Sequence, residues 1–122
     1  MFNIRNPINS LRKNASLAAV AEATLSYSHA LKRAHLNVED RRTENNHARW
    51  TDTDLRSESE QLNTAGMEWN NAAQHLYRLA GLDFDAANEQ EWERTRAIRA
   101  ARALRDANGK LTLDLTTLPR NA

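Results

Sequence analysis

Mostly apolar residues recur at alternating steps of three and four along two stretches of this chain, and this spacing constrains the fold more than any other feature. The first stretch contains Leu17, Val20, Thr24, Tyr27, Leu31, Ala34 and Val38. The second contains Leu62, Ala65, Trp69, Ala72, Leu76 and Leu79. Such spacing places side chains along one side of an α-helix, where they form a seam that packs against another helix. The sequence therefore predicts two helices that pack together.

Residues with known preferences for helix ends mark where these helices begin and end. Ser16 precedes the first seam and is a plausible N-cap, while Gly81 follows the second and suits a left-handed C-terminal cap. Asp83 or Asp85 can cap a third helix, which is expected to end within residues 106–109, where the sequence reads Asp-Ala-Asn-Gly.

The stretch between the two seams, residues 39–60, is strongly polar and allows two interpretations. It could be a polar helix that projects into solvent, or the chain could turn near residues 50–55, where Thr51, Asp52 and Thr53 all have side chains suited to capping. We favour the turn, which joins the two helices into an antiparallel hairpin.

These features predict one mainly α-helical domain spanning residues 1–122. It consists of an extended N-terminal arm (1–15), the helical hairpin and third helix (16–108), and a C-terminal extended tail (109–122) with a short β-like segment. The arm carries Arg5, Arg12 and Lys13 and no acidic residue, but Pro7 and neighbouring asparagines interrupt any long amphipathic pattern. We expect the arm to pack on the first helix rather than to serve as a secretory segment.

The C-terminal tail shows a different periodicity. Leu111, Leu113 and Leu115 alternate with polar residues, as in a half-buried strand, yet no other segment of the chain alternates in this way. We expect this strand to pair with another polypeptide, either a neighbouring subunit or a sheet edge of a partner. Two alternatives remain: pairing with the short N-terminal segment at residues 2–4, or an extended course in a groove of the helices.

The third helix separates its charges. Residues 83–93 contain five acidic residues and no basic residue, whereas residues 94–105 contain five arginines and no acidic residue. Arg96, Arg99 and Arg102 fall along one stripe that could contact nucleic-acid phosphates. The helix dipole, however, favours acids at the N-terminus and arginines at the C-terminus without any ligand. The 17 basic and 16 acidic residues give a net charge of only +1, which also weighs against nucleic-acid binding.

Catalytic and metal-binding patterns are scarce. The chain has no cysteine, and its four histidines lack the spacings of common zinc motifs. No nucleophile elbow or glycine-rich phosphate loop is present. No apolar run is long enough to span a membrane. We therefore expect a protein that is not an enzyme, with no cofactor and no metal.

Large buried anchors are few, since much of the apolar content is alanine and the chain holds only three Trp, two Tyr and two Phe. A thin core predicts that partner surfaces supply part of the stability. We expect a structural or interaction protein, a helical subunit of a homo-oligomer or larger assembly, that engages partners through its helix seams and the C-terminal strand. In general type this suits a phage or mobile-element structural or accessory protein. Leu111, Leu113, Leu115 and Trp50 are the predicted partner contacts, and Trp50 is the candidate exposed anchor. The alternative is a nucleic-acid-binding module.

Overall fold

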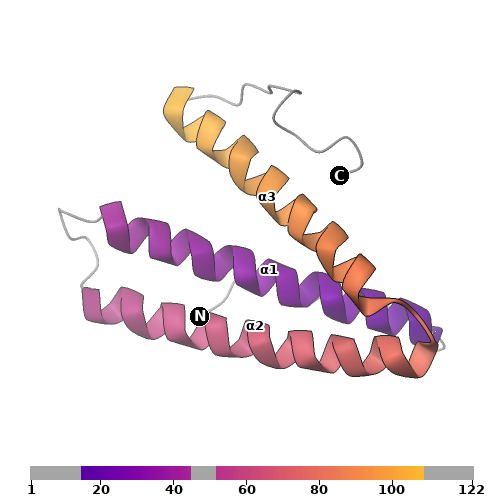
Figure 1. The fold of residues 1–122 in the computed structure, drawn as a ribbon. Helices are drawn as coiled ribbons and strands as arrows, with labels where there is room; N and C mark the ends of the chain where they lie inside the picture. The colour runs from indigo at the N-terminus through magenta and orange to yellow at the C-terminus, as the bar shows by residue number, and fades with distance from the viewer. Residues whose placement is uncertain (1–14, 45–51, 109–122) are drawn as a thin grey trace. The chain divides into compact units, whose positions relative to one another are not determined.

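A computed structural model describes residues 15–44 and 52–108 of the chain, with side chains described for residues 15–42 and 54–104. Its elements are α1 (Leu17–Glu44), α2 (Asp52–Ala80) and α3 (Phe84–Asn108) (Figure 1). The described part of the chain contains no strand. The mainly helical fold expected from the sequence is thus confirmed. Most of the N-terminal arm, Trp50 and the C-terminal segment with its three leucines lie outside the described residues.

Helices α1 and α2 pack side by side along their lengths (Figure 1). They run antiparallel, because Ser28 of α1 contacts Asn70 of α2 whereas His35, further along α1, contacts the earlier residue Ser59. A turn within the polar stretch, rather than a continuous rod, is therefore confirmed, but its predicted position at residues 50–55 is wrong in part, because residues 52–55 already belong to α2. The chain reverses between Glu44 and Asp52, so most of the polar stretch is helical on both sides of the reversal.

The core of the hairpin is a buried cluster contributed by both helices, comprising Leu31, Val38, Leu55 and Leu62. Tyr27, Ala34, Ala65 and Trp69 pack against this cluster and are partly buried. The rings of Tyr27 and Trp69 meet edge to face, with their centroids 4.8 Å apart. The apolar seams predicted from the sequence therefore meet within one chain.

Two details of the predicted seam on α2 are wrong. Ala72 and Leu79 are exposed, whereas Gly66 and Ala73 are buried. The buried side of α2 follows small residues that pattern reading passes over. A Cβ atom at Gly66 would lie 3.7 Å from Leu31 Cβ and from the Ser28 carbonyl oxygen, so the two backbones approach closely at this position. The seam also continues into the polar stretch through Leu55.

The helix ends follow the expected capping chemistry. Ser16 Oγ accepts a hydrogen bond from the Ala19 amide at 3.1 Å, which confirms Ser16 as an N-cap. Gly81 has a φ of 71°, and its amide donates to the Arg78 carbonyl at 3.2 Å. The Leu82 amide donates to the Tyr77 carbonyl at 2.9 Å, which completes a Schellman motif. Asp83 directly precedes α3, in the N-cap position.

The structure forms two compact units whose boundary lies between Phe84 and Asp85. The hairpin belongs to the first unit and all of α3 after Phe84 to the second, so we describe α3 by itself. The single domain expected from the sequence remains a prediction.

Candidate functional site

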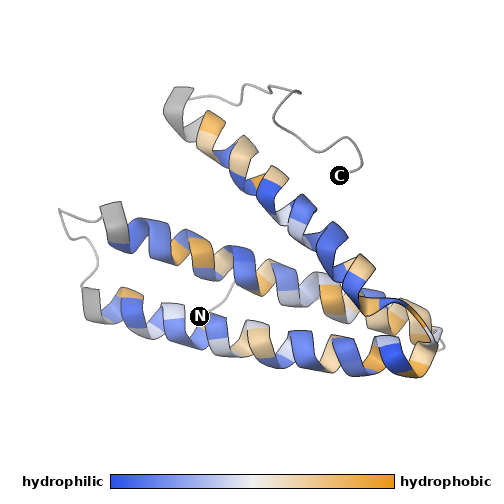
Figure 2. Cartoon of the chain, in the orientation of Figure 1, coloured by the Kyte–Doolittle hydropathy of each residue, from blue (hydrophilic) through white to orange (hydrophobic). Residues whose placement is uncertain are grey.

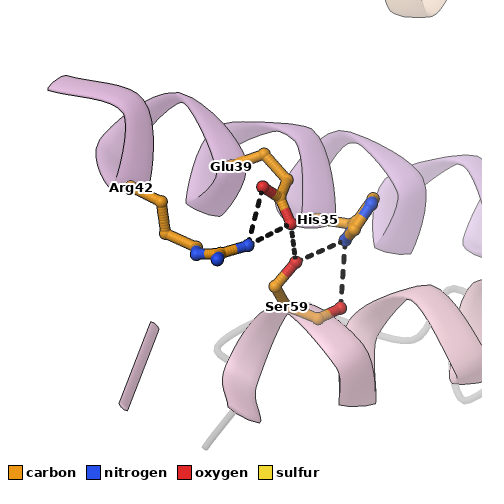
Figure 3. Close-up of polar contacts among 4 residues, drawn as sticks. All are labelled: His35, Glu39, Arg42 and Ser59. Carbon is orange, nitrogen blue, oxygen red and sulfur yellow. Dashed lines mark hydrogen bonds and ion pairs between the residues drawn. The ribbon is translucent and has the colours of Figure 1, made fainter. Parts of the chain in front are cut away.

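The most organised group of polar side chains in the described structure lies across the hairpin seam. It comprises His35, Glu39, Arg42 and Ser59, and we call it the polar layer (Figure 3). His35, Glu39 and Arg42 lie on α1 at steps of four and three residues, so they share one helix face. Ser59 comes from α2 and is 2% exposed. The polar layer begins one turn after Leu31, so it continues the apolar seam.

The direction of each hydrogen bond in the polar layer follows from its partners. His35 Nδ1 lies 3.0 Å from the Ser59 carbonyl oxygen, which can only accept, so Nδ1 carries the proton. The same nitrogen lies 3.0 Å from Ser59 Oγ. Ser59 Oγ in turn donates its proton to Glu39 Oε1. The protons therefore point in one direction, from the imidazole through the hydroxyl to the carboxylate.

The Glu39 carboxylate accepts hydrogen bonds from two other residues of the polar layer. Arg42 Nη1 lies 3.1 Å from both carboxylate oxygens, in an i, i+3 ion pair on α1. The hydrogen bond from Ser59 is the main cause that lowers the pKa of Glu39 below its ordinary value, and the charge and hydrogen bond of Arg42 lower it further. Partial burial acts in the opposite direction. Glu39 is therefore held as a carboxylate.

A serine beside a histidine and a glutamate raises the question of nucleophilic catalysis, and the geometry argues against it. A general base must accept the serine proton, but His35 Nδ1 donates in this arrangement and the Ser59 proton goes to Glu39. Ser59 is also buried within the seam, where a substrate has no access. The layer is suited to orienting two helices rather than to chemistry.

A second polar contact crosses the seam closer to the start of α1. Asn70 Nδ2 donates to Ser28 Oγ at 3.3 Å, and Ser28 Oγ donates to the Leu25 carbonyl at 2.7 Å. Ser28 is fully buried, and the neighbouring Thr24 donates to the Val20 carbonyl at 2.7 Å. Each of these two contacts between the helices thus involves a small hydroxyl side chain that is buried in the seam.

Large apolar side chains are exposed at one end of the hairpin. Leu79 is 60% exposed, Leu17 43% and Leu82 39%. The antiparallel packing brings the start of α1 and the end of α2 to the same end of the hairpin, where both helices carry hydrophobic residues (Figure 2). We call Leu17, Leu79 and Leu82 the apolar end. Met67, at 57% exposure, lies further back on α2.

The predicted phosphate-binding arginines fall on α3, and the structure gives them different surroundings. Arg96 is exposed and forms an ion pair with Glu89, with Nη2 and Oε1 separated by 3.0 Å. Arg102 is exposed, and Arg99 is half-buried. Trp50, Leu111, Leu113 and Leu115 lie outside the described residues, so their predicted roles stay predictions.

Sequence reasoning missed the polar layer, although the sequence contains a signal for it. His35 and Glu39 each lie one position after a predicted seam residue, Ala34 and Val38 respectively. A search restricted to apolar residues ends at Val38, whereas a search for polar residues beside the seam would find both. The partner Ser59 is harder to find because its pairing depends on where the chain reverses.

No protein-family model matches this chain, and no curated protein or solved structure shows significant similarity to it. Within residues 15–44 and 52–108, no helix has both the length and the hydropathy needed to cross a bilayer. The same residues contain no group of three or more His, Cys, Asp or Glu side chains arranged to hold a metal ion.

Proposed function

We propose that this chain is a non-enzymatic structural or interaction protein that associates with copies of itself, as a helical subunit of a homo-oligomer or larger assembly. The observation that carries the proposal is the apolar end, where Leu17, Leu79 and Leu82 are each exposed. Burying a leucine side chain contributes about 1.5–3 kcal/mol, so exposed leucines at one end of the hairpin favour association.

The central leucines of both seams are not available to a partner, because Leu31 and Leu62 are buried against each other's helices. This refines the expectation that the seams themselves engage partners. The apolar end lies beyond this buried seam, where α1 begins and α2 ends. A second copy presents an identical apolar end, so a two-fold interface would bury the same patch on both subunits.

The polar layer is consistent with the structural role in this proposal. Its hydroxyl proton and its histidine proton are both directed to acceptors within the layer. The predicted contacts at Trp50, Leu111, Leu113 and Leu115 remain part of the proposal, as a second means of engaging a partner.

Light scattering of the full chain over a range of concentrations tests this proposal. We expect a molar mass above 13.9 kDa that rises with concentration. Leu79→Ser should lower the association, because it removes the most exposed leucine of the apolar end. Met67→Ser is the matched control, since Met67 has similar exposure on the same helix but lies about 18 Å away along its axis. A wild-type chain that stays monomeric at all concentrations would contradict the proposal.

The alternative, nucleic-acid binding through Arg96, Arg99 and Arg102, is less well supported. The carboxylate of Glu89 already neutralises Arg96 and would repel a phosphate beside it. If the alternative holds, replacing the three arginines with alanine should reduce the salt slope of binding by about three phosphate contacts. A gel-shift assay at low salt that shows no binding by the wild type would remove this alternative.

A further inference from the structure

The charges of α3 change sign in the middle of the helix, between Glu93 and Arg94. The helix dipole explains acids in the first turn and bases in the last turn, but its effect falls off within those turns. Glu93 and Arg94 lie more than two turns from the N-terminus of α3, which begins at Phe84. The dipole therefore does not account for the central part of the pattern.

One face of α3 carries acidic residues in its first half and basic residues in its second half. Steps of four and three residues define it, and its members are Asp85, Glu89, Trp92, Arg96 and Arg99. Asp85, Glu89 and Arg96 are exposed, and Trp92 is half-buried. The ion pair between Glu89 and Arg96 shows that these two side chains lie on the same face. We call this set the charged stripe.

From this pattern we infer that α3 pairs antiparallel with α3 of a second copy of the chain, through the charged stripe. We place the two-fold axis of the pair at the level of residue 94 along the helix. Glu89 then lies opposite Arg99 of the partner subunit, and Trp92 lies opposite Arg96 of the partner subunit. Both contacts occur twice by symmetry. The first is an ion pair, and the second places a guanidinium against an aromatic ring.

Charge complementarity selects both the occupant and its direction. A parallel copy would place acids against acids, at a cost in association. A nucleic acid would meet carboxylates along half of the charged stripe. An antiparallel copy matches the acidic half of each stripe with the basic half of the other. The inference rests on the proposed self-association and names a surface and a geometry for it.

Charge reversal provides the first test, measured by light scattering of the full chain. Glu89→Arg alone and Arg99→Glu alone should each weaken association by roughly tenfold or more, because each places like charges together twice, arginine against arginine or glutamate against glutamate. A mixture of the two variants, and a single chain carrying both substitutions, should regain association. Arg94→Glu is the matched control, since it makes the same charge change on an exposed residue about 140° away around the helix from Arg99.

Introduced cysteines test the direction of pairing, and the chain has none of its own. Asp85→Cys should not cross-link with itself, because the two copies of residue 85 would lie about 27 Å apart along an antiparallel pair. A mixture of Asp85→Cys and Ala103→Cys should form a mixed disulfide dimer. Self-cross-linking of Asp85→Cys without mixed dimers would indicate parallel pairing and overturn the inference.

The outcomes separate this inference from the proposed function. A monomeric wild type overturns both. Association that responds to Leu79→Ser but is unchanged by Glu89→Arg and Arg99→Glu overturns the charged-stripe inference alone. Association that falls with either charge reversal and returns in the mixture supports it. Binding of DNA by a chain whose molar mass does not change would assign the charged stripe to nucleic acid and overturn pairing.

Discussion

The hairpin seam contains two neighbouring regions with different chemistry. The apolar cluster around Leu31 and Leu62 removes hydrocarbon from water, and the polar layer around Glu39 and Ser59 exchanges directed hydrogen bonds. Burial is non-directional, so leucines can pack against several neighbours along a facing helix. The polar layer is satisfied only when Ser59 lies opposite His35 and Glu39. We infer that the cluster supplies most of the free energy of folding and that the polar layer selects the register of the two helices.

The largest expected effect comes from removing side-chain volume in the apolar cluster. Leu31→Ala should lower the free energy of unfolding by about 2–5 kcal/mol, because Leu31 is 1% exposed and its loss leaves a cavity. Leu76→Ala should cost less, since Leu76 is only half-buried. Chemical denaturation followed by circular dichroism measures both. If neither variant changes the midpoint, the cluster is not the stabilising region and the comparison is wrong.

A smaller effect is expected from the polar layer. Ser59→Ala removes the donor to Glu39 and should cost about 1 kcal/mol, because Glu39 keeps Arg42 and partial access to water. Combining Ser59→Ala with Glu39→Gln should cost less than the sum of the two single variants, since both disrupt one network. Ser57→Ala, on the exposed side of α2, is the control and should stay within about 0.5 kcal/mol. Additive costs for Ser59 and Glu39 would show that the layer does not act as a unit.

The apolar region was largely predictable from the sequence, and the polar layer was not. Leu31, Val38 and Leu62 stand out by spacing, and the caps at Ser16 and Gly81 have local signatures that need no tertiary information. The buried side of α2 was misplaced at Ala72 and Leu79 because the helices meet through Gly66 and Ala73. Small residues at a close contact carry little hydrophobic signal, yet they determine which side of a helix faces its partner.

The polar layer depends on a pairing that no local pattern encodes. Nothing close to His35 and Glu39 in the sequence indicates their pairing, because their partner Ser59 lies on the other helix, 20 residues beyond Glu39. Glu89 and Arg96 differ, because both lie on α3 and their shared face follows from helical periodicity. Contacts within one helix could therefore be inferred from the sequence, while contacts between helices required the register.

Gly66 tests the close approach of the helices directly. Gly66→Ala should stabilise the chain by about 0.5–1 kcal/mol, because alanine has the higher helix propensity and the new Cβ finds ordinary contact distances, 3.5 Å to Lys32 Cγ being the shortest. Gly81→Ala is the opposite case, since Gly81 has a φ of 71°, and it should destabilise the C-terminal cap of α2. Thermal unfolding compares the two variants. Destabilisation by Gly66→Ala would mean that the backbones pack more tightly than these distances indicate.

The smallest expected effect is the pH dependence of the polar layer. Because the pKa of Glu39 is lowered in the folded chain, the carboxylate contributes stability that is fully present above its unfolded pKa, near the ordinary value of 4.5. That stability is lost as the pH falls from there through the folded pKa. The thermal midpoint of the wild type should therefore drop over this acidic window, and Glu39→Gln should show a shallower drop.

Glu60→Gln is the control for this experiment. Glu60 is exposed on α2, and its substitution removes the same negative charge as Glu39→Gln. The two variants should separate the layer from the general effect of acid on the protein. Equal slopes for Glu39→Gln and Glu60→Gln would mean that Ser59 and Arg42 give Glu39 no special stability, and the polar layer would then differ from the apolar cluster in composition but not in role. If the thermal midpoint falls less steeply with pH in Glu39→Gln but not in Glu60→Gln, the hydrogen bonds that select the register depend on the charged form of the Glu39 carboxylate. The apolar cluster contains no such charged group.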